Sequence, residues 1–278
     1  KECKIVYTTH DYQLVCPSHG MFDVNMKPCE RCLDGHYIHC LQTKCLKNSR
    51  AKSLLGTLDG YMWKYSKAYS YVDAYICCSY FLKSKLDTQK RFRDKTIGLH
   101  NFKKEMPHLD NIQKKGYVLE FGHLSRDKGT DTLLEVAKKM PNTEFVFIGY
   151  GPSVDKMKDI PNVKYLGFKT GEELYRIIAE AAISVCPSEW YENCPFSVME
   201  SQMYGTPVLG ANIGGIPELI RVGKTGELFE SGNAEDLKKK IEKLWGDKKL
   251  CAEYSANCKD ISFDTIDEYY EKIMKVYR

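Results

Sequence analysis

The residues best suited to chemistry lie between Pro187 and Glu218, in the stretch PSEWYENCPFSVMESQMYGTPVLGANIGGIPE. Glu192 precedes a helix-compatible segment, and Glu200 lies eight residues later within it. The glycine pair Gly214-Gly215 follows the next apolar run. Carboxylates accept hydrogen bonds from hydroxyl groups, and a glycine turn lets backbone N–H groups approach a phosphate. This pattern favours a ligand that carries both hydroxyl and phosphate groups.

The elements around these residues form a strand–loop–helix–strand unit. Residues 181–188 are an apolar, β-branched run that predicts a buried strand. Residues 196–204 are helix-compatible and stop at a glycine and a proline, and residues 207–211 predict the next strand. In a parallel sheet, ligands bind where strands end and helices begin. The alternative is that the two glutamates are solvated surface acids and the glycines are simple turns, and the whole context weighs against it.

The segment ENCPFSVME (192–200), followed by GTPVLG and GGIPE, resembles the E-x7-E region of the family-4 retaining glycosyltransferases, which have the GT-B fold. The resemblance extends across essentially the whole chain. It implies an α/β protein with two Rossmann-like domains and parallel sheets. Because the chain starts at Lys1 without Met and runs directly into an apolar strand, we expect the first domain to be incomplete.

We expect three parts along the chain. Residues 1–103 are the remainder of an N-terminal, acceptor-side domain that carries a cysteine-rich insertion at 16–45. Residues 104–260 are the nucleotide-sugar-binding domain, whose element order fits a Rossmann-like half. Residues 261–278 are a final helix, which in GT-B enzymes packs back on the first domain.

The composition is that of an ordinary globular chain, with 43% hydrophobic and 28% charged residues, which excludes disordered and fibrous classes. There is no apolar run near the ~20 residues that span a bilayer and no signal peptide, so the expected location is the cytoplasm, at the inner face of the plasma membrane if the protein is peripheral. Residues 1–100 hold 16 Lys+Arg against 9 Asp+Glu. This basic half fits a membrane headgroup layer, a phosphorylated lipid acceptor or a nucleic acid, or it is only a solvated face.

One histidine gains a role through the resemblance. The stretch KIVYTTHDY (4–12) alternates as a strand that ends at His10. A lone histidine is usually structural, but family members carry a His at this strand end, beside the reacting sugar of the donor. The resemblance therefore assigns His10, together with Glu192, to the catalytic site.

Five cysteines are concentrated in 30 residues, and they include a C-x2-C pair. The spacing indicates a four-thiolate structural zinc site of Cys29, Cys32, Cys40 and Cys45, with Cys16 as an alternative ligand and His36 and His39 as spare ligands. Free thiols in a loop are the competing interpretation. Metal binding would supply ordering free energy to a loop with little core of its own.

Residues 47–72 place apolar side chains at helical spacing, interleaved with lysines. Such a helix either lies at a membrane interface or packs its apolar stripe into a core, and we favour the core. Residues 74–86 predict a buried strand followed by a helix capped at Ser79, with Cys77 and Cys78 in the core.

The second domain opens with a strand, a glycine turn and a helix at residues 116–140, and its basic residues stand near the helix N-terminus, which favours an anion. It resembles the family segment G-R-L-x-x-x-K-G, in which Arg and Lys hold the donor diphosphate. Lys128 matches, whereas His123 stands at the Arg position, and Arg126 is an alternative donor to phosphate. The donor-binding set that the resemblance implies is His123, Arg126, Lys128, Gly149, Gly151, Phe196, Ser197, Glu200, Gly214 and Gly215.

By resemblance, the protein transfers a sugar from a UDP- or GDP-sugar to an acceptor hydroxyl with retention, without a catalytic metal. The acceptor is then lipid-linked or a glycan, in bacterial envelope polysaccharide or glycolipid synthesis, with peripheral membrane contact through the basic half and no nucleic-acid partner. Glu192 would hold the sugar hydroxyls of the donor, and Glu200 its ribose hydroxyls. The alternatives are a GT-B sugar-nucleotide epimerase, a zinc-containing nucleic-acid-binding protein, and a donor-binding fragment without activity.

Overall fold

The computed structural model describes residues 3–103 and 105–278 and divides the chain into two units. Unit 1 contains the chain up to Phe102, the short segment Trp190–Cys194 and the C-terminal segment Asp264–Arg278. Unit 2 contains the rest. The predicted domain ranges that begin at Lys1 and Lys104 begin outside the described residues. The sequence did not indicate that residues 190–194 belong with the first unit.

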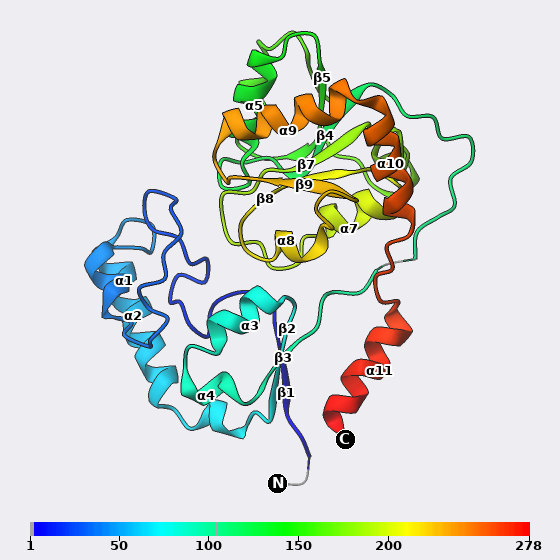
Figure 1. The fold of residues 1–278 in the computed structure, drawn as a ribbon. Helices are drawn as coiled ribbons and strands as arrows, with labels where there is room; N and C mark the ends of the chain where they lie inside the picture. The colour runs from blue at the N-terminus through cyan, green and yellow to red at the C-terminus, as the bar shows by residue number, and fades with distance from the viewer. Residues whose placement is uncertain (1–2, 104) are drawn as a thin grey trace. The chain divides into compact units, whose positions relative to one another are not determined.

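Unit 1 is built on a three-stranded parallel sheet in the order β1-β2-β3 (Figure 1). Its elements are β1 (Val6–Thr9), α1 (Ile38–Thr43), α2 (Arg50–Tyr65), the 3-10 turn η1 (Ala68–Tyr71), β2 (Ala74–Cys77), α3 (Tyr80–Leu86), α4 (Lys90–Arg93), β3 (Thr96–Gly98) and α11 (Ile266–Tyr277). Ser79 caps α3 by accepting a hydrogen bond from the Leu82 amide, and Cys77 and Cys78 are buried, which confirms these predictions.

Unit 2 has a six-stranded parallel sheet in the order β6-β5-β4-β7-β8-β9. Its strands are β4 (Tyr117–His123), β5 (Glu144–Tyr150), β6 (Val163–Tyr165), β7 (Ile183–Cys186), β8 (Val208–Ala211) and β9 (Gly226–Phe229). Its helices are α5 (Thr130–Lys139), η2 (Val154–Met157), α6 (Gly171–Glu180), α7 (Phe196–Met203), α8 (Ile216–Leu219), α9 (Ala234–Gly246) and α10 (Lys248–Lys259). Two parallel-sheet units confirm the predicted fold class.

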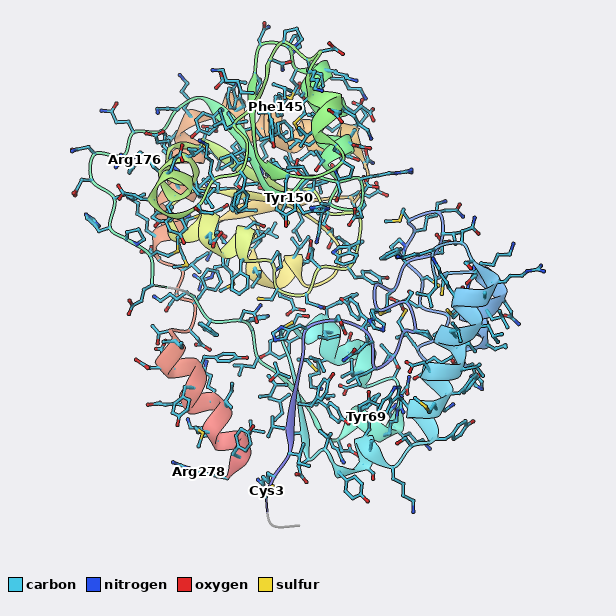
Figure 2. All side chains as sticks on the ribbon, turned by 180° about the vertical axis from the view of Figure 1, so that it is seen from behind. Cys3, Tyr69, Phe145, Tyr150, Arg176 and Arg278 are labelled. Atoms are coloured by element: carbon cyan, nitrogen blue, oxygen red, sulfur yellow. The ribbon has the colours of Figure 1, made fainter. Side chains whose placement is uncertain are left out.

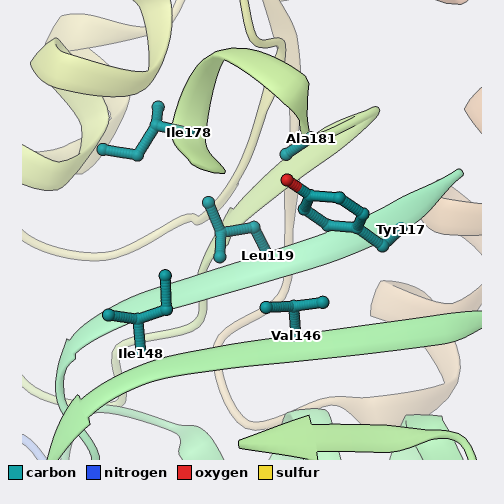
Figure 3. Close-up of a cluster of buried hydrophobic side chains, with 6 residues drawn as sticks. All are labelled: Tyr117, Leu119, Val146, Ile148, Ile178 and Ala181. Atoms are coloured by element: carbon teal, nitrogen blue, oxygen red, sulfur yellow. The ribbon is translucent and has the colours of Figure 1, made fainter. Parts of the chain in front are cut away.

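The sequences of the unit 2 strands are mostly continuous apolar runs because helices cover both faces of the sheet. On one face, Tyr117 and Leu119 of β4 and Val146 of β5 pack against Ile178 of α6, with Ile148 and Ala181 beside them (Figure 3). On the other side α5 packs on α9, and α9 also contacts β8 and β9. This double cover fixes the strand ends from which the loops of the site begin.

One sequence-based interpretation is wrong. The apolar stripe of the segment 47–72 was expected to pack into a core, but Leu54, Leu58 and Met62 are exposed, and the buried residues of α2 are Ser53 and Thr57. The helix packs through small polar residues because these allow close approach to the neighbouring loop. Among the described residues, no helix is long and apolar enough to cross a membrane.

Candidate active site

The carboxyl-terminal edge of the unit 2 sheet contains most of the predicted donor-binding residues. The strand order reverses direction between β4 and β7, which is the position where open α/β sheets bind ligands. The loops that follow these two strands are joined, because the Glu189 amide donates a hydrogen bond to the Asp127 carbonyl at 2.9 Å. The switch point is therefore bordered by two loops that hold each other in place.

The end of β4 and the loop after it present His123, Arg126 and Lys128 beside a helix N-terminus. A tight turn bonds the Lys128 amide to the Ser125 carbonyl, and Gly129, with a φ of 78°, forms the N-cap of α5. His123 and Arg126 are exposed, whereas Lys128 is half-buried. The backbone N–H groups of the first helical turn and the cations Arg126 and Lys128 favour an anion at the same place.

His123 also contacts the end of the neighbouring strand. Its ring lies edge-on to that of Tyr150, with 5.3 Å between the centroids. Tyr150, labelled in Figure 2, ends β5 at the same sheet edge. An imidazole in this position is a hydrogen-bond donor at the site where the family motif has an arginine.

Gly149 and Gly151 are required by backbone packing. A Cβ atom on Gly149 would lie 1.8 Å from the Gly122 carbonyl oxygen, and one on Gly151 would lie 2.1 Å from the Leu124 oxygen. Both residues have φ values that side chains rarely adopt, 134° and 154°. The glycine pattern after β5 is thus explained by close contact with the end of β4, and any ligand contact comes in addition.

Helix α7 carries Phe196, Ser197 and Glu200 on a firmly anchored frame. Phe196 is exposed, and Ser197 and Glu200 are half-buried. Two hydrogen bonds anchor the helix. The Ser201 hydroxyl bonds the Ser184 hydroxyl of β7 at 2.9 Å, and the Gln202 side-chain amide donates to the Leu219 carbonyl at 2.9 Å. Sequence reasoning missed these two supporting residues, because Ser and Gln within a helix give no signal of burial.

The glycine pair lies in the turn between β8 and α8. Gly214 has a φ of 61°, and the Gly215 carbonyl accepts a hydrogen bond from the Glu218 amide at 3.2 Å. Since β8 is the neighbour of β7, this turn lies at the same sheet edge as the cationic loop.

In unit 1 the structure brings His10 and Glu192 to one pocket. The cavity measures about 170 Å³ and is lined by residues that follow β1, β2 and β3, by the cysteine-rich segment and by the segment 190–194. Its lining residues are His10, Asp11, Tyr12, His19, Cys78, Asn101, Trp190, Tyr191, Glu192, Asn193 and Cys194. His10 is exposed and Glu192 is half-buried. An imidazole, carboxylates and amides around one cavity provide the donors and acceptors that a polyhydroxylated ligand needs.

Hydrogen bonds attach the segment 190–194 to unit 1. Asn193 donates to the His10 carbonyl at 2.8 Å, and Asn101 donates to the Cys194 carbonyl at 3.3 Å. The Tyr191 hydroxyl donates to Glu30 at 2.8 Å. Burial, followed by this carboxylate, raises the pKa of Tyr191, so the phenol remains a donor. These anchors had no sequence signal, because their partners lie more than 90 residues away along the chain.

The five clustered cysteines line a second, smaller cavity of about 10 Å³ in unit 1, together with Ser18 and His39. Burial first, and then the neighbouring thiols of Cys16, Cys45 and Cys29, raise the pKa of Cys32 to about 12. His36 instead pairs with Asp34 at 2.7 Å. Within residues 3–103 and 105–278, no group of three or more His, Cys, Asp or Glu side chains is arranged to hold a metal ion.

Comparison with known proteins decides the family. The family model described as "Glycosyl transferases group 1" matches residues 101–260, which is more than half of the chain. The chain belongs to the group 1 glycosyl transferases. The matched region contains the cationic loop after β4, helix α7 and the glycine turn after β8.

Two similar proteins are longer than the region that aligns with this chain. An uncharacterized 41.2 kDa protein in the cps region of Klebsiella pneumoniae is 33% identical over 180 residues, which cover 60% of this chain and 49% of that protein. The sulfoquinovosyl transferase SQD2 of Arabidopsis thaliana is 34% identical over 142 residues, which cover 49% of this chain and 28% of that protein. The alignment thus spans about half or less of either relative's length.

Solved structures show the fold. Anabaena HepE in complex with UDP matches with a TM-score of 0.71 and 17% identity, covering 98% of this chain and 72% of that one. A variant of S. aureus TarM, in complex with Fondaparinux, alpha-GlcNAc-glycerol and UDP, matches with a TM-score of 0.67 and 21% identity, covering 79% of this chain and 46% of that one. The glycosyltransferase has the GT-B fold.

Proposed function

We propose that this glycosyltransferase moves a sugar from a nucleoside-diphosphate sugar to an acceptor hydroxyl with retention of configuration. The observation that carries the proposal is the cationic loop at the switch point of the unit 2 sheet, where Lys128 and Arg126 stand at the N-terminus of α5. The leaving diphosphate gains negative charge as the glycosidic bond breaks. Fixed cations and helix-terminal N–H groups stabilise that charge and lower the barrier.

In this proposal the two units contribute different chemistry. Lys128, with His123 and Arg126, binds the diphosphate, and the Glu200 carboxylate accepts hydrogen bonds from the ribose hydroxyls. In unit 1, Glu192 and His10 bind sugar hydroxyls in the pocket that they share. A sugar-nucleotide epimerase would use a similar donor site, and the products of the reaction distinguish the two activities.

For the donor base we favour uridine. HepE has been solved with UDP, with UDP and glucose and with UDP-glucose, and the TarM variant was also solved with UDP.

Calorimetric titration of the chain with UDP and with GDP tests the donor site. We expect UDP to bind, and we expect Lys128→Ala and Glu200→Ala each to weaken binding about 10- to 100-fold, since each removes a charge-assisted hydrogen bond worth about 1.5–3 kcal/mol. Lys138→Ala is the matched control, because Lys138 is an exposed lysine in the last turn of the same helix, α5.

Loss of affinity in the control alone, or no affinity for either nucleotide, would overturn the proposed donor site. Salt-sensitive binding to generic DNA or RNA in place of nucleotide binding would instead support a nucleic-acid-binding protein. With a UDP-sugar and a mixture of lipid-linked and free glycan acceptors, a transferase yields a glycosylated product with the α or β configuration of the donor. An epimerase yields only an altered sugar nucleotide.

We propose that the acceptor belongs to envelope polysaccharide or glycolipid synthesis. The support is that one relative is encoded in the cps region of Klebsiella pneumoniae, and that another, 29% identical over 157 residues, is the amylovoran biosynthesis glycosyltransferase AmsK of Erwinia amylovora. The product assay with lipid-linked and free glycan acceptors tests this assignment. Transfer to neither would contradict it.

We also propose that the cysteine cluster takes up a structural zinc ion. Five thiols line one cavity, and Cys16 is among the buried ones, so the ligand set is drawn from Cys16, Cys29, Cys32, Cys40 and Cys45. Because their arrangement does not yet hold a metal, uptake requires the side chains to close on the ion and lose their protons. Cobalt substitution would then give thiolate-to-metal absorption that Cys32→Ser removes and Cys251→Ser, in unit 2, retains. A chain that purifies without metal and gives no such spectrum contradicts the zinc hypothesis.

A further inference from the structure

Helix α2 presents an apolar stripe that the rest of unit 1 does not cover. The side chains of Leu54, Leu55, Leu58, Met62 and Tyr65 are between 44% and 76% exposed. Leu55, Leu58, Met62 and Tyr65 follow Leu54 by 1, 4, 8 and 11 residues, and this spacing places all five side chains on one face of the helix. A contiguous exposed apolar stripe marks an interaction surface more often than scattered apolar residues do.

The opposite face of α2 is fixed to the protein by small polar residues. The Ser53 hydroxyl accepts a hydrogen bond from the Leu46 amide at 3.1 Å, and the Thr57 hydroxyl donates to the Tyr37 carbonyl at 3.2 Å. A Cβ atom on Gly60 would lie 2.9 Å from the ring of Tyr37. Helix α2 packs against α1 on this side (Figure 1). The helix therefore cannot rotate its leucines inward without breaking these contacts.

The surroundings of the stripe are strongly basic. Between residues 44 and 67 there are six Lys or Arg residues and a single acidic residue, Asp59. One of the six, Lys64, donates to the Gly35 carbonyl at 2.9 Å, which leaves five for the outer surface. Arg50 and Lys52, at the start of the helix, are both exposed. Long basic side chains rest their methylene stems on apolar surface while their charges reach outward. Apolar and cationic groups thus share one surface.

The charge decides which partner fits this surface. Pairing the stripe with that of a second copy would bring two strongly cationic helices together, and like charges oppose such an interface. A lipid surface with anionic headgroups attracts the basic residues and receives the apolar side chains at the boundary of its hydrocarbon. Trp63, partly exposed and bonded to Asp59 at 3.1 Å, is of the amphipathic type that concentrates at such interfaces.

We propose that the outer face of α2 docks this glycosyltransferase on an anionic bilayer surface. Leu54, Leu55, Leu58, Met62 and Tyr65 enter the headgroup boundary, while Arg50 and Lys52 contact phosphate groups. The helix lies in the plane of the membrane and does not span it. The proposal does not depend on which nucleotide or sugar the protein uses.

Co-sedimentation with vesicles tests the proposal directly. The 278-residue chain is expected to bind vesicles of phosphatidylglycerol and phosphatidylcholine far more tightly than vesicles of phosphatidylcholine alone, and to lose affinity as salt rises. The combined variant Leu55→Ser, Leu58→Ser and Met62→Ser should bind at least about tenfold more weakly. Arg50→Gln with Lys52→Gln should weaken binding to anionic vesicles by about fivefold for each charge removed.

The matched control is Ile266→Ser with Tyr270→Ser, two exposed apolar residues on α11 in the same unit, and it should bind like the wild type. Circular dichroism of each variant establishes that it folds. A wild-type chain that ignores anionic vesicles, or a triple variant that binds as the wild type does, overturns the proposal. Self-association of the wild type that the triple variant abolishes, seen by analytical ultracentrifugation, would show that a second copy covers the stripe instead.

Discussion

The two units hold their functional residues in place by different physical means. In unit 2 a six-stranded parallel sheet ends each strand at the same edge, and buried apolar side chains fix the strands. In unit 1 the segment between His10 and Tyr37 contains a single isolated bridge and no longer element. Polar side chains help to hold this segment in place: Arg91 donates to the Tyr37 hydroxyl at 2.9 Å and to the Leu14 carbonyl at 3.2 Å.

The apolar side chains of β4 and of α2 have opposite environments. Leu119 of β4 is fully buried, whereas Leu58 of α2 is mostly exposed. The stability of the unit 2 sheet should therefore depend on its buried apolar side chains, whereas the position of α2 in unit 1 should depend on individual hydrogen bonds. Four predictions test this contrast, in order of decreasing effect.

The largest effect is expected from Leu119→Ala. Removing a fully buried leucine leaves a cavity in the cluster on β4 and should lower the free energy of unfolding by about 2–5 kcal/mol. Hydrogen exchange of peptides from β4 and β5 measures this loss for unit 2 itself. A change below 1 kcal/mol would mean that the sheet does not depend on this cluster.

The second prediction concerns pH and the buried Glu120. Burial raises the pKa of this carboxyl from 4.5 to about 8, although it accepts a hydrogen bond from Thr130 at 2.7 Å. The folded state therefore binds the proton more tightly than the unfolded state, and this stability is present below pH 4.5 and is lost as pH rises through 8.

Glu120→Gln should remove that dependence, since the amide keeps an acceptor for Thr130 and does not titrate. Between pH 5 and 8 the wild type should lose up to about 1.4 kcal/mol per pH unit relative to the variant, in denaturant titrations at each pH. Parallel pH profiles of the two proteins would contradict the shift.

A smaller effect is expected in unit 1 from Thr57→Val. The substitution keeps the shape of the side chain and removes the hydrogen bond to Tyr37, which should cost about 1 kcal/mol. Thr170→Val is the control, because Thr170 is exposed and its side chain makes no capping bond. Equal stability of the two variants would show that polar anchors do not hold α2.

The smallest effect on stability is expected from Leu58→Ala. This substitution is chemically identical to Leu119→Ala, but its side chain already contacts solvent, so we expect a change within about 0.5 kcal/mol. Denaturation of the two variants side by side makes the comparison. A loss of several kcal/mol would show that the stripe on α2 packs against the protein.

The regularity of unit 2 explains why its elements could be predicted. Continuous apolar runs between glycine turns mark buried parallel strands, such as the predicted strands at 181–188 and 207–211, which correspond to β7 and β8. In α2, periodicity alone indicated an amphipathic helix and could not indicate which face points inward. Only the contacts of Ser53 and Thr57 decide that.

The sequence by itself determined the family of this protein, because the family motif depends on residue types at fixed short spacings, such as Glu192 and Glu200. The tertiary structure decided which distant residues meet. It placed Glu192 in the pocket of His10, through Asn193 and its bond to the His10 carbonyl. The physical reason is that such contacts depend on how the 182 residues between His10 and Asn193 fold, and no local pattern encodes that path.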